Sequence, residues 1–537
     1  MVARHVSGMA STSASLLTVV AVLAAFFLLW RWTERRDLRE PPYVRSRIPF
    51  IGHILGMIRY GARYFQLINA ETRYPIFGLP MLNTRNYIVT EPTLAGHVQR
   101  DQKSLSFYLL IVEVTRRLIA FDKNAARVTF ENMHGENGPG GLMAEVHEMM
   151  NRHLAPGPGL DDMTRIQMEH TAGIVNSLGE RMETGLYAWL RHAFSLSNMQ
   201  AIYGPENIFV THPELEKAFW QFEEGMLGLV IDVLPRWTAR KAYRARRRVL
   251  DGLADYVGQK RYKHASPMIR ERVETNLNYG MSERMAGHGE LVLIFGILGN
   301  AVPSLFWLVT MIFSRPELLR QIRAEAQQTV QVSDPVDTAG ERLRHATVSS
   351  KTVQRACPLL YSCYRETLRY ISLLTSPRMV TEDTMLGGKW LLRKGSIVQI
   401  AGGIIHYDER IWGSDVASFN PYRFLSPADE PVVVEGQGQQ ARTALPLPRG
   451  VPSPAFRAFG GGTVLCPGRH FAQGELMVTA AVLAMGFDIQ DVGGETLQVP
   501  DKDDMRIPLS VMKPVFDPQV SITRRKDWED VRWHIRA

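Results

Sequence analysis

The sequence predicts a mostly α-helical protein with small β-sheets. Apolar residues follow a helical pattern through most of the chain, whereas strand-like runs are few and short. These runs cluster at "NYIVTEP" (residues 86–92) and between Ser376 and Ile405, for example "WLLRKGSIVQIAGG". With 45% hydrophobic and 22% charged residues, the 537-residue chain is long enough to bury a large core. Length alone suggests about three domains, but no internal repeat is visible.

Net charge and cysteine content indicate the kind of partner and the redox compartment of the protein. The formal net charge of +8 indicates attraction to an acidic surface, and we expect anionic lipid or an acidic protein rather than nucleic acid. The three cysteines, Cys357, Cys363 and Cys466, are too few for a disulfide framework. They fit a reducing compartment, where a reactive thiol persists.

The first 53 residues predict a membrane anchor. After a short segment (residues 1–14), residues 15–32 are apolar up to Arg31 and just long enough to cross a bilayer as one helix. Basic residues are more frequent after this run than before it, which predicts that the body of the protein is cytosolic. A cleaved signal peptide is the rival interpretation, but bulky residues end the run instead of a small-residue cleavage site. Residues 33–53 then form a proline-rich hinge.

A second apolar run, Leu291–Phe313, contains no charged residue. Its composition would allow another membrane span. However, glycine, asparagine and proline interrupt its middle (residues 296–303), and Ser314 and Glu317 behind it have capping-box spacing for a new helix. A second span would also separate Cys466 from the cytosol. We therefore expect a helix buried inside the globular domain.

Two tempting motifs are rejected. The pattern at residues 436–441 matches a dinucleotide-binding fingerprint, but the prolines behind it exclude the helix that must hold the pyrophosphate. "HEMMN" at His147 resembles a zinc-protease motif, but Asn151 stands where the second histidine is needed. Cys357 and Cys363 lie in an apolar helical stretch and are expected to be core thiols.

The stretch "FGGGTVLCPGRHFA" presents Cys466 on a glycine-rich loop directly before an apolar, helix-like run. The dipole and free N–H groups of a helix N-terminus lower the pKa of a thiol and stabilise a metal–sulfur bond. Glycines let the backbone approach a flat ligand closely. From spacing alone, a structural glycine turn and a metal-ligand loop stay equally open.

The pattern Phe459-x-x-Gly462-x-x-x-Cys466-x-Gly468-x-x-x-Ala472 resembles the haem-ligand loop of the cytochrome P450 family. Further motifs of that family occur in the family's order, so the resemblance covers essentially the whole chain.

Two of these motifs concern a structural network and the haem edge. "YRETLRY" supplies Glu366 and Arg369, one helical turn apart and therefore on one face. "SFNPYRFL" supplies Arg423, which in this family completes a buried network with that pair. "SPRMV" has Arg378 where P450s bind a haem propionate.

The resemblance implies one cytochrome P450 domain over residues 54–537, in place of three domains, behind the N-terminal transmembrane helix. It implies haem b (iron protoporphyrin IX) as cofactor, with Cys466 as the ligand of its iron. Electrons would come from NADPH through NADPH–cytochrome P450 reductase. It also implies the endoplasmic reticulum membrane, with a single span and a cytosolic catalytic domain.

Several positions depart from the common pattern. Most P450s place an acid and then a threonine in the central helix for proton delivery, whereas this chain has Gly299 and Asn300, the candidate catalytic positions. This resembles the branch of sterol 7α-hydroxylases and prostacyclin synthase. Val464 replaces a common haem-contacting arginine. Propionate binding is therefore expected to depend on Arg378, helped by Arg152.

That branch contains hydroxylases and isomerases, so two enzymatic hypotheses stay open. We favour a monooxygenase that inserts one oxygen atom from O2 into a lipophilic substrate, which is a steroid-like, terpenoid or other specialised metabolite. The alternative is a P450-fold isomerase or dehydratase that acts on an oxygenated substrate without external electrons. A haem-binding carrier or sensor is the non-enzymatic hypothesis.

Overall fold

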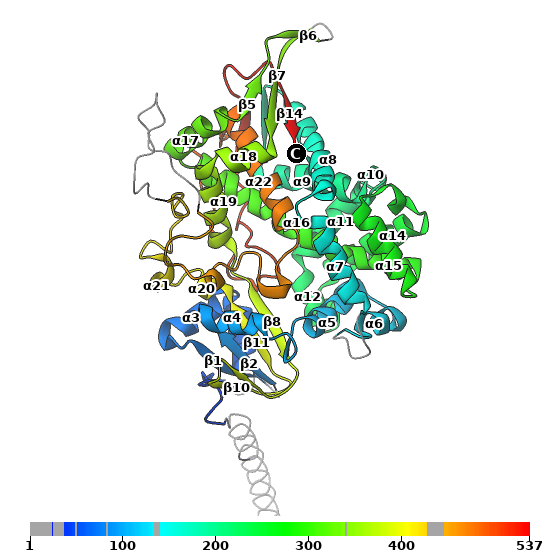
Figure 1. Ribbon diagram of the computed structural model, residues 1–537, viewed down its shortest axis with the longest axis vertical. Coiled ribbons are helices and arrows are strands. Elements are labelled where there is room, and N and C mark those ends of the chain that lie inside the picture. The colour runs from blue at the N-terminus through cyan, green and yellow to red at the C-terminus, as the bar shows by residue number, and fades with distance from the viewer. Residues whose placement is uncertain are drawn as a thin grey trace, which may run out of the picture.

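The computed structural model describes residue 24 and residues 37–48, 51–81, 84–133, 140–338, 341–426 and 445–537. The rest of the predicted anchor (residues 15–32) and the stretch with the rejected dinucleotide pattern lie outside these residues. Within the described part, helices dominate and strands form small sheets (Figure 1). The predicted class, mostly α with small β-sheets, is confirmed.

The helices outside the core bundle are distributed over the whole chain. They are α2 (Gly52–Tyr60), α3 (Arg63–Thr72), α4 (Pro92–Arg100), α5 (Tyr108–Ile119), α6 (Lys123–Phe130), α7 (Leu142–Leu154), α10 (Ile208–Thr211), α11 (Glu214–Glu224), α12 (Met226–Ile231), α13 (Pro235–Thr238), α15 (Pro267–Asn278), α17 (Pro316–Gln327), α18 (Ser350–Ala356), α19 (Pro358–Ile371), α20 (Gly402–Ile405) and α21 (Glu409–Trp412).

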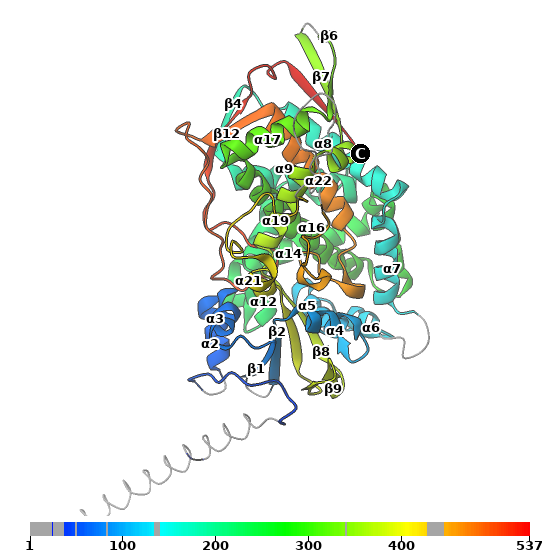
Figure 2. The ribbon, with the colours of Figure 1, turned by 60° about the vertical axis from the view of Figure 1, so that its left-hand side comes forward.

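Helix α16 (Glu283–Phe313) runs through the middle of the molecule in both views (Figures 1 and 2). Ser282 caps it, since the hydroxyl accepts a hydrogen bond from the Met285 N–H. Among the described residues α16 is the one helix long and apolar enough to span a bilayer, yet every residue from Ala301 to Phe313 is buried in protein. The expectation of an internal helix is confirmed.

Three further helices pack with α16 into the core: α8 (Pro158–Asn176), α9 (Leu186–Tyr203) and α22 (Arg469–Gly486). Helix α14 (Arg240–Gly258) covers α16 from another side. These helices carry wide apolar faces, which explains why they associate in water.

A five-stranded sheet lies below these helices in Figure 1, in the order β1-β2-β11-β8-β3. Its strands are β1 (Ile76–Met81), β2 (Thr84–Val89), β3 (Leu105–Ser106), β8 (Thr375–Val380) and β11 (Ile397–Ala401). Only the β2–β11 pair is parallel. The two regions with strand-like sequence therefore meet as neighbours in one sheet, although about 300 residues separate them in the chain.

The remaining strands form smaller sheets. They are β12-β13-β4 (Phe487–Asp491, Gln519–Arg524, Arg181–Gly185), β14-β7-β5 (Val531–Arg536, Glu341–Ser349, Val330–Val332) with β6 (Val336–Thr338) on β7, and β10-β9 (Trp390–Leu392, Thr384–Leu386).

The start of α17 differs from the expectation. Ser314 ends α16, and its hydroxyl donates to the Met311 carbonyl, so no capping box with Glu317 forms. Pro316 occupies the first helical position instead, where its fixed φ and missing N–H are tolerated.

Candidate active site

The loop before α22 lies between the helical core and the five-stranded sheet in both views (Figures 1 and 2). The Cys466 N–H donates to the Phe459 carbonyl at 2.9 Å and closes the loop. Gly462 has φ +63°, and a Cβ there would lie 2.8 Å from the Gln99 carbonyl oxygen of α4. Glycine is therefore required at this position for both conformation and space.

The electrostatics of Cys466 depend on burial and on the following helix. Burial raises the pKa of the Cys466 thiol, whereas the backbone N–H groups of Gly468 and Arg469 act in the opposite direction. The helix N-terminus thus contributes as expected, but burial outweighs it. A metal cation bound to the sulfur would supply the missing stabilisation of the thiolate.

Two buried arginines lie near this loop without an acidic partner. Arg378 on β8 and Arg457 just before the loop are 3% and 8% exposed. No carboxylate among the described residues pairs with either, and Arg457 Nη2 has no hydrogen-bond partner there. Burial lowers the pKa of each guanidinium to about 10, and the charge of Arg378 also lowers the pKa of Arg457. Such a pair requires an anion, and the carboxylates of a haem fit.

His406 fixes the backbone at Arg457. Its Nδ1 lies 3.1 Å from the Ser372 carbonyl oxygen, which can only accept, so Nδ1 carries the hydrogen. Its Nε2 accepts from the Arg457 N–H at 2.7 Å. Burial lowers the pKa of His406 to about 3, so the ring stays neutral in this arrangement.

The middle of α16 leaves one face open. Gly296 is exposed, and a Cβ there would meet no atom within 4 Å. Val292 and Asn300, four residues to either side, are partly exposed on the same face. Gly299 is buried, and its Cβ position lies 2.9 Å from the Phe295 ring, so an acidic side chain would not fit there without moving that ring. The helix backbone at Gly296 is therefore not covered by side chains on this face.

Both ends of the Asn300 amide are engaged. Nδ2 donates to the Gly296 carbonyl at 2.9 Å, and Oδ1 accepts from the Val511 N–H at 3.2 Å. Pro303 has no N–H, so the Gly299 carbonyl lacks its usual helical hydrogen bond. The Asn300 amide donates to the Gly296 carbonyl and not to this one. One N–H and one lone pair of the amide remain for another partner.

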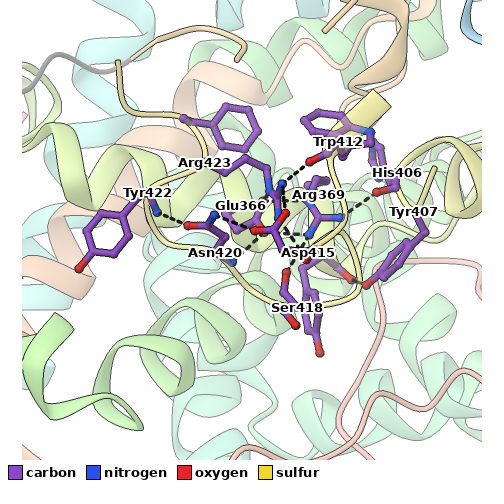
Figure 3. A network of polar contacts seen from close by, with 12 residues as sticks. Glu366, Arg369, His406, Tyr407, Trp412, Asp415, Ser418, Asn420, Tyr422 and Arg423 are labelled. Atoms are coloured by element: carbon purple, nitrogen blue, oxygen red, sulfur yellow. Dashed lines mark hydrogen bonds and ion pairs between the residues drawn. The ribbon is translucent and has the colours of Figure 1, made fainter. Parts of the chain in front are cut away.

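The structure brings Glu366, Arg369 and Arg423 together (Figure 3). Glu366 and Arg369 on α19 are fully buried, and the guanidinium donates to both carboxylate oxygens, each at 2.8 Å. Arg423 Nε donates to Glu366 Oε2 at 3.1 Å. This is a bidentate ion pair with a second cation on the same carboxylate.

Surrounding groups satisfy the rest of this network. The Asn420 N–H donates to Glu366 Oε1 at 3.0 Å, Arg369 Nη1 donates to the His406 carbonyl at 2.7 Å, and Arg423 Nη1 donates to Asp415 Oδ1 at 2.9 Å. Full pairing offsets the cost of taking these charges out of water. Because His406 also holds Arg457, the network connects α19 to the Cys466 loop.

Two arginines differ from the sequence-based prediction of the propionate site, Arg457 and Arg152. Arg152 on α7 is exposed and, like His153, pairs with Glu271 of α15. The expectation that Arg152 helps Arg378 is therefore wrong. The signal for Arg457 was its place in "AFRAFGGG", two residues before Phe459. Cys357 and Cys363 are both buried, which confirms the expectation that they are core thiols.

Comparison with known proteins assigns this architecture to a family. The family profile described as Cytochrome P450 matches residues 231–513, more than half of the chain. The chain belongs to the cytochrome P450 family. Cytochrome P450 monooxygenase nodJ of Hypoxylon pulicicidum is 32% identical to this P450 over 97% of both chains. A cytochrome P450 monooxygenase of Gibberella zeae is 29% identical over 96% of this chain and 95% of its own.

A sterol hydroxylase is a more distant relative. The 7-alpha-hydroxycholest-4-en-3-one 12-alpha-hydroxylase of Oryctolagus cuniculus is 22% identical over 94% of this P450 and 97% of its own length. This agrees with the likeness to sterol hydroxylases that Asn300 indicated. The relatives named here are monooxygenases or hydroxylases, so the P450 is an enzyme of the monooxygenase class and a haem-thiolate protein by family.

Proposed function

We propose that this P450 inserts one oxygen atom from O2 into a lipophilic substrate of the steroid, terpenoid or related specialised-metabolite kind. The observation that carries the substrate class is the open face of α16, where Val292, Gly296 and Asn300 bear no charge. Apolar surface with a few polar groups is typical of sites for lipophilic ligands. The sterol in the name of the relative from Oryctolagus cuniculus supports the same class.

We infer that Cys466 is the ligand of the haem iron and that Arg378 and Arg457 hold the propionates. Haem with a cysteinate ligand supplies O–O bond cleavage. The shape of the loop would bring the Cys466 sulfur to the haem iron, and this shape depends on Phe459, Gly462, Gly468 and Ala472. These residues bind and orient, and they take no proton themselves.

We propose that Asn300 orients the water molecule that supplies the proton. The bonds to Gly296 and Val511 hold its amide in one orientation, and its free N–H and lone pair can orient a water molecule. Gly299 contributes only space for the Phe295 ring.

NADPH–cytochrome P450 reductase is the proposed electron donor. Residues 15–32 are the proposed single span in the endoplasmic reticulum membrane, with the catalytic domain in the cytosol.

The test uses membranes that contain the full-length P450 and reductase, supplied with sterols and terpenoids one at a time. We expect NADPH consumption together with a product heavier by one oxygen atom, and neither with Cys466→Ala. Product formation that needs no NADPH would contradict the proposal and favour isomerisation.

A further inference from the structure

The chain between β12 and β13 contains a short segment, residues 510–513, that forms neither a helix nor a strand. Ser510, Val511 and Met512 are buried in it. A buried segment of this kind has no helical turn or sheet ladder to hold it. Its position therefore depends on individual hydrogen bonds and ion pairs with neighbouring elements.

The middle of this segment is attached to α16 and α19. The Val511 N–H donates to Asn300 Oδ1 at 3.2 Å, and the Trp307 indole N–H of the same helix donates to the Met512 carbonyl at 2.7 Å. The Met512 N–H donates to the Ile371 carbonyl of α19 at 3.2 Å. Among the described residues Val511 is the one donor to Asn300 Oδ1, so this N–H determines where the amide oxygen points.

The end of the segment is attached to α11. Lys513 Nζ forms an ion pair with Glu223 in the last turn of that helix, although 290 residues separate the two in the chain. Glu223 is buried, and among the described residues Lys513 is the one cation that pairs with it. Removal of one partner from such a pair leaves the other charge uncompensated, so the pair holds the segment against α11.

Helix α11 is itself firmly fixed. Trp220 and Phe222 on it are buried, and the Trp220 indole N–H donates to the Ser195 hydroxyl of α9 at 3.3 Å. Glu223 therefore sits on a rigid support, and it is Lys513 that is drawn to a fixed point.

The short distance along the chain connects this point to Asn300. Lys513 is two residues from Val511, which is at most about 7 Å of chain, so a shift of Lys513 reaches the N–H that fixes the amide. Without the Val511 bond, the Asn300 side chain keeps only its bond to the Gly296 carbonyl of its own helix. The amide oxygen would then lose its defined direction.

We propose that Glu223 is a positioning residue for Asn300. Its ion pair with Lys513 holds residues 510–513 where the Val511 N–H fixes the Asn300 amide, an inference that rests on the role proposed for Asn300.

The first test is amide hydrogen exchange of the full-length holoenzyme, measured by mass spectrometry on peptides that contain residues 510–513. We expect Glu223→Gln to accelerate exchange there by about tenfold. The matched control is Glu224→Gln, which removes the same charge from the next residue of α11, whose partner Arg191 lies 3.5 Å away at the surface. We expect no change in that control.

Two variants of Lys513 keep the test decisive if Glu223→Gln yields little holoenzyme. Lys513→Gln should accelerate exchange as Glu223→Gln does. Lys513→Arg should keep the original rate, because a guanidinium also pairs with a carboxylate.

The second test uses carbon monoxide as a probe of Asn300 and needs no substrate. The infrared C–O stretching band of the reduced carbon monoxide complex responds to polar groups near the bound molecule. We expect Asn300→Ala to shift this band and Glu223→Gln to broaden it, because an amide with several orientations produces several local fields. In the Asn300→Ala background, Glu223→Gln should have no further effect on the band.

Equal exchange rates at residues 510–513 in Glu223→Gln and Glu224→Gln would overturn the inference. Faster exchange in Glu223→Gln with an unbroadened C–O band would also overturn it when Asn300→Ala shifts the band, because the pair would then serve stability alone. A band that Asn300→Ala leaves in place would instead contradict the role proposed for Asn300, and the inference would fall with it.

Discussion

The Val511 N–H donates to the Asn300 side-chain carbonyl at 3.2 Å. This hydrogen bond joins the middle of α16 to the segment between β12 and β13. Trp307, two turns further along α16, reinforces this contact, because its indole N–H donates to the Met512 carbonyl at 2.7 Å. Asn300 is therefore both part of the open face of α16 and fixed by a distant segment. An amide held in this way can present its remaining N–H in a constant direction.

Asn300→Ala should uncouple NADPH consumption from product formation. Without the amide, the water that supplies the proton loses its orienting group, and reduced oxygen leaves as peroxide. Asn300→Thr should recover part of the coupling, because a hydroxyl both donates and accepts. The measurement is the ratio of product to NADPH consumed.

Ser304→Ala is the matched control for Asn300, because the Ser304 hydroxyl donates to the Asn300 backbone carbonyl at 2.7 Å in the same part of α16. It should leave that ratio unchanged. An Asn300→Ala enzyme that is less stable but equally coupled would show that the amide serves only to hold Val511.

Cys466→Ala should abolish the red-shifted Soret band of the reduced carbon monoxide complex, which in this family requires a thiolate ligand. Cys363→Ala is the control, because that thiol is buried in α19. An unchanged band in Cys466→Ala would end the ligand assignment.

Glu366→Ala should give little holoprotein. Removal of the shared carboxylate leaves the buried Arg369 without its charge partner and leaves Arg423 with Asp415 alone, which costs roughly 3–5 kcal/mol. Haem content and thermal midpoint measure the effect. Glu317→Ala, which breaks an exposed pair with Arg320, should change the midpoint little. Normal haem incorporation in Glu366→Ala would mean that the network is dispensable.

Arg457→Gln should accelerate haem loss to apomyoglobin by about tenfold or more, because a hydrogen bond to a charged group contributes about 1.5–3 kcal/mol. Arg152→Gln separates the two candidate arginines, since Arg152 pairs with Glu271 on the surface. We expect no change in that control. Equal haem retention in Arg457→Gln and the unmodified protein would refute the propionate assignment.

Local patterns carried much of the sequence-based prediction. Glu366 and Arg369 are neighbours because of helical spacing alone, and the apolar run of α16 is buried because a long helix without charge must be covered. The sequence does not indicate a role for Arg457, because that role depends on Arg378 of β8, and only tertiary packing brings the two residues near each other. Arg152 was misassigned for the same reason: the orientation of α7 toward Glu271 is set by its packing with α15, not by local sequence.

Glu475 provides the pH-dependent prediction. This α22 residue is 1% exposed, and its Oε2 has no hydrogen-bond partner among the described residues. Burial raises the pKa of Glu475 from 4.5 to about 8. Between these two values the folded protein keeps a proton that the unfolded chain releases. The free energy of unfolding should therefore decrease as the pH rises through this range, by at most about 1.4 kcal/mol per pH unit.

Glu475→Gln keeps the size and polarity of the side chain but cannot ionise. Its stability relative to the unmodified protein should therefore increase from pH 4.5 to pH 8, measured as the denaturation midpoint of the holoenzyme at each pH. Glu495→Gln, at an exposed loop position, corrects for the removal of one carboxylate from the chain. Once that control is subtracted, the remaining pH dependence belongs to the buried carboxyl. A constant difference between Glu475→Gln and the unmodified protein across this range would mean that the fold does not raise the pKa of Glu475.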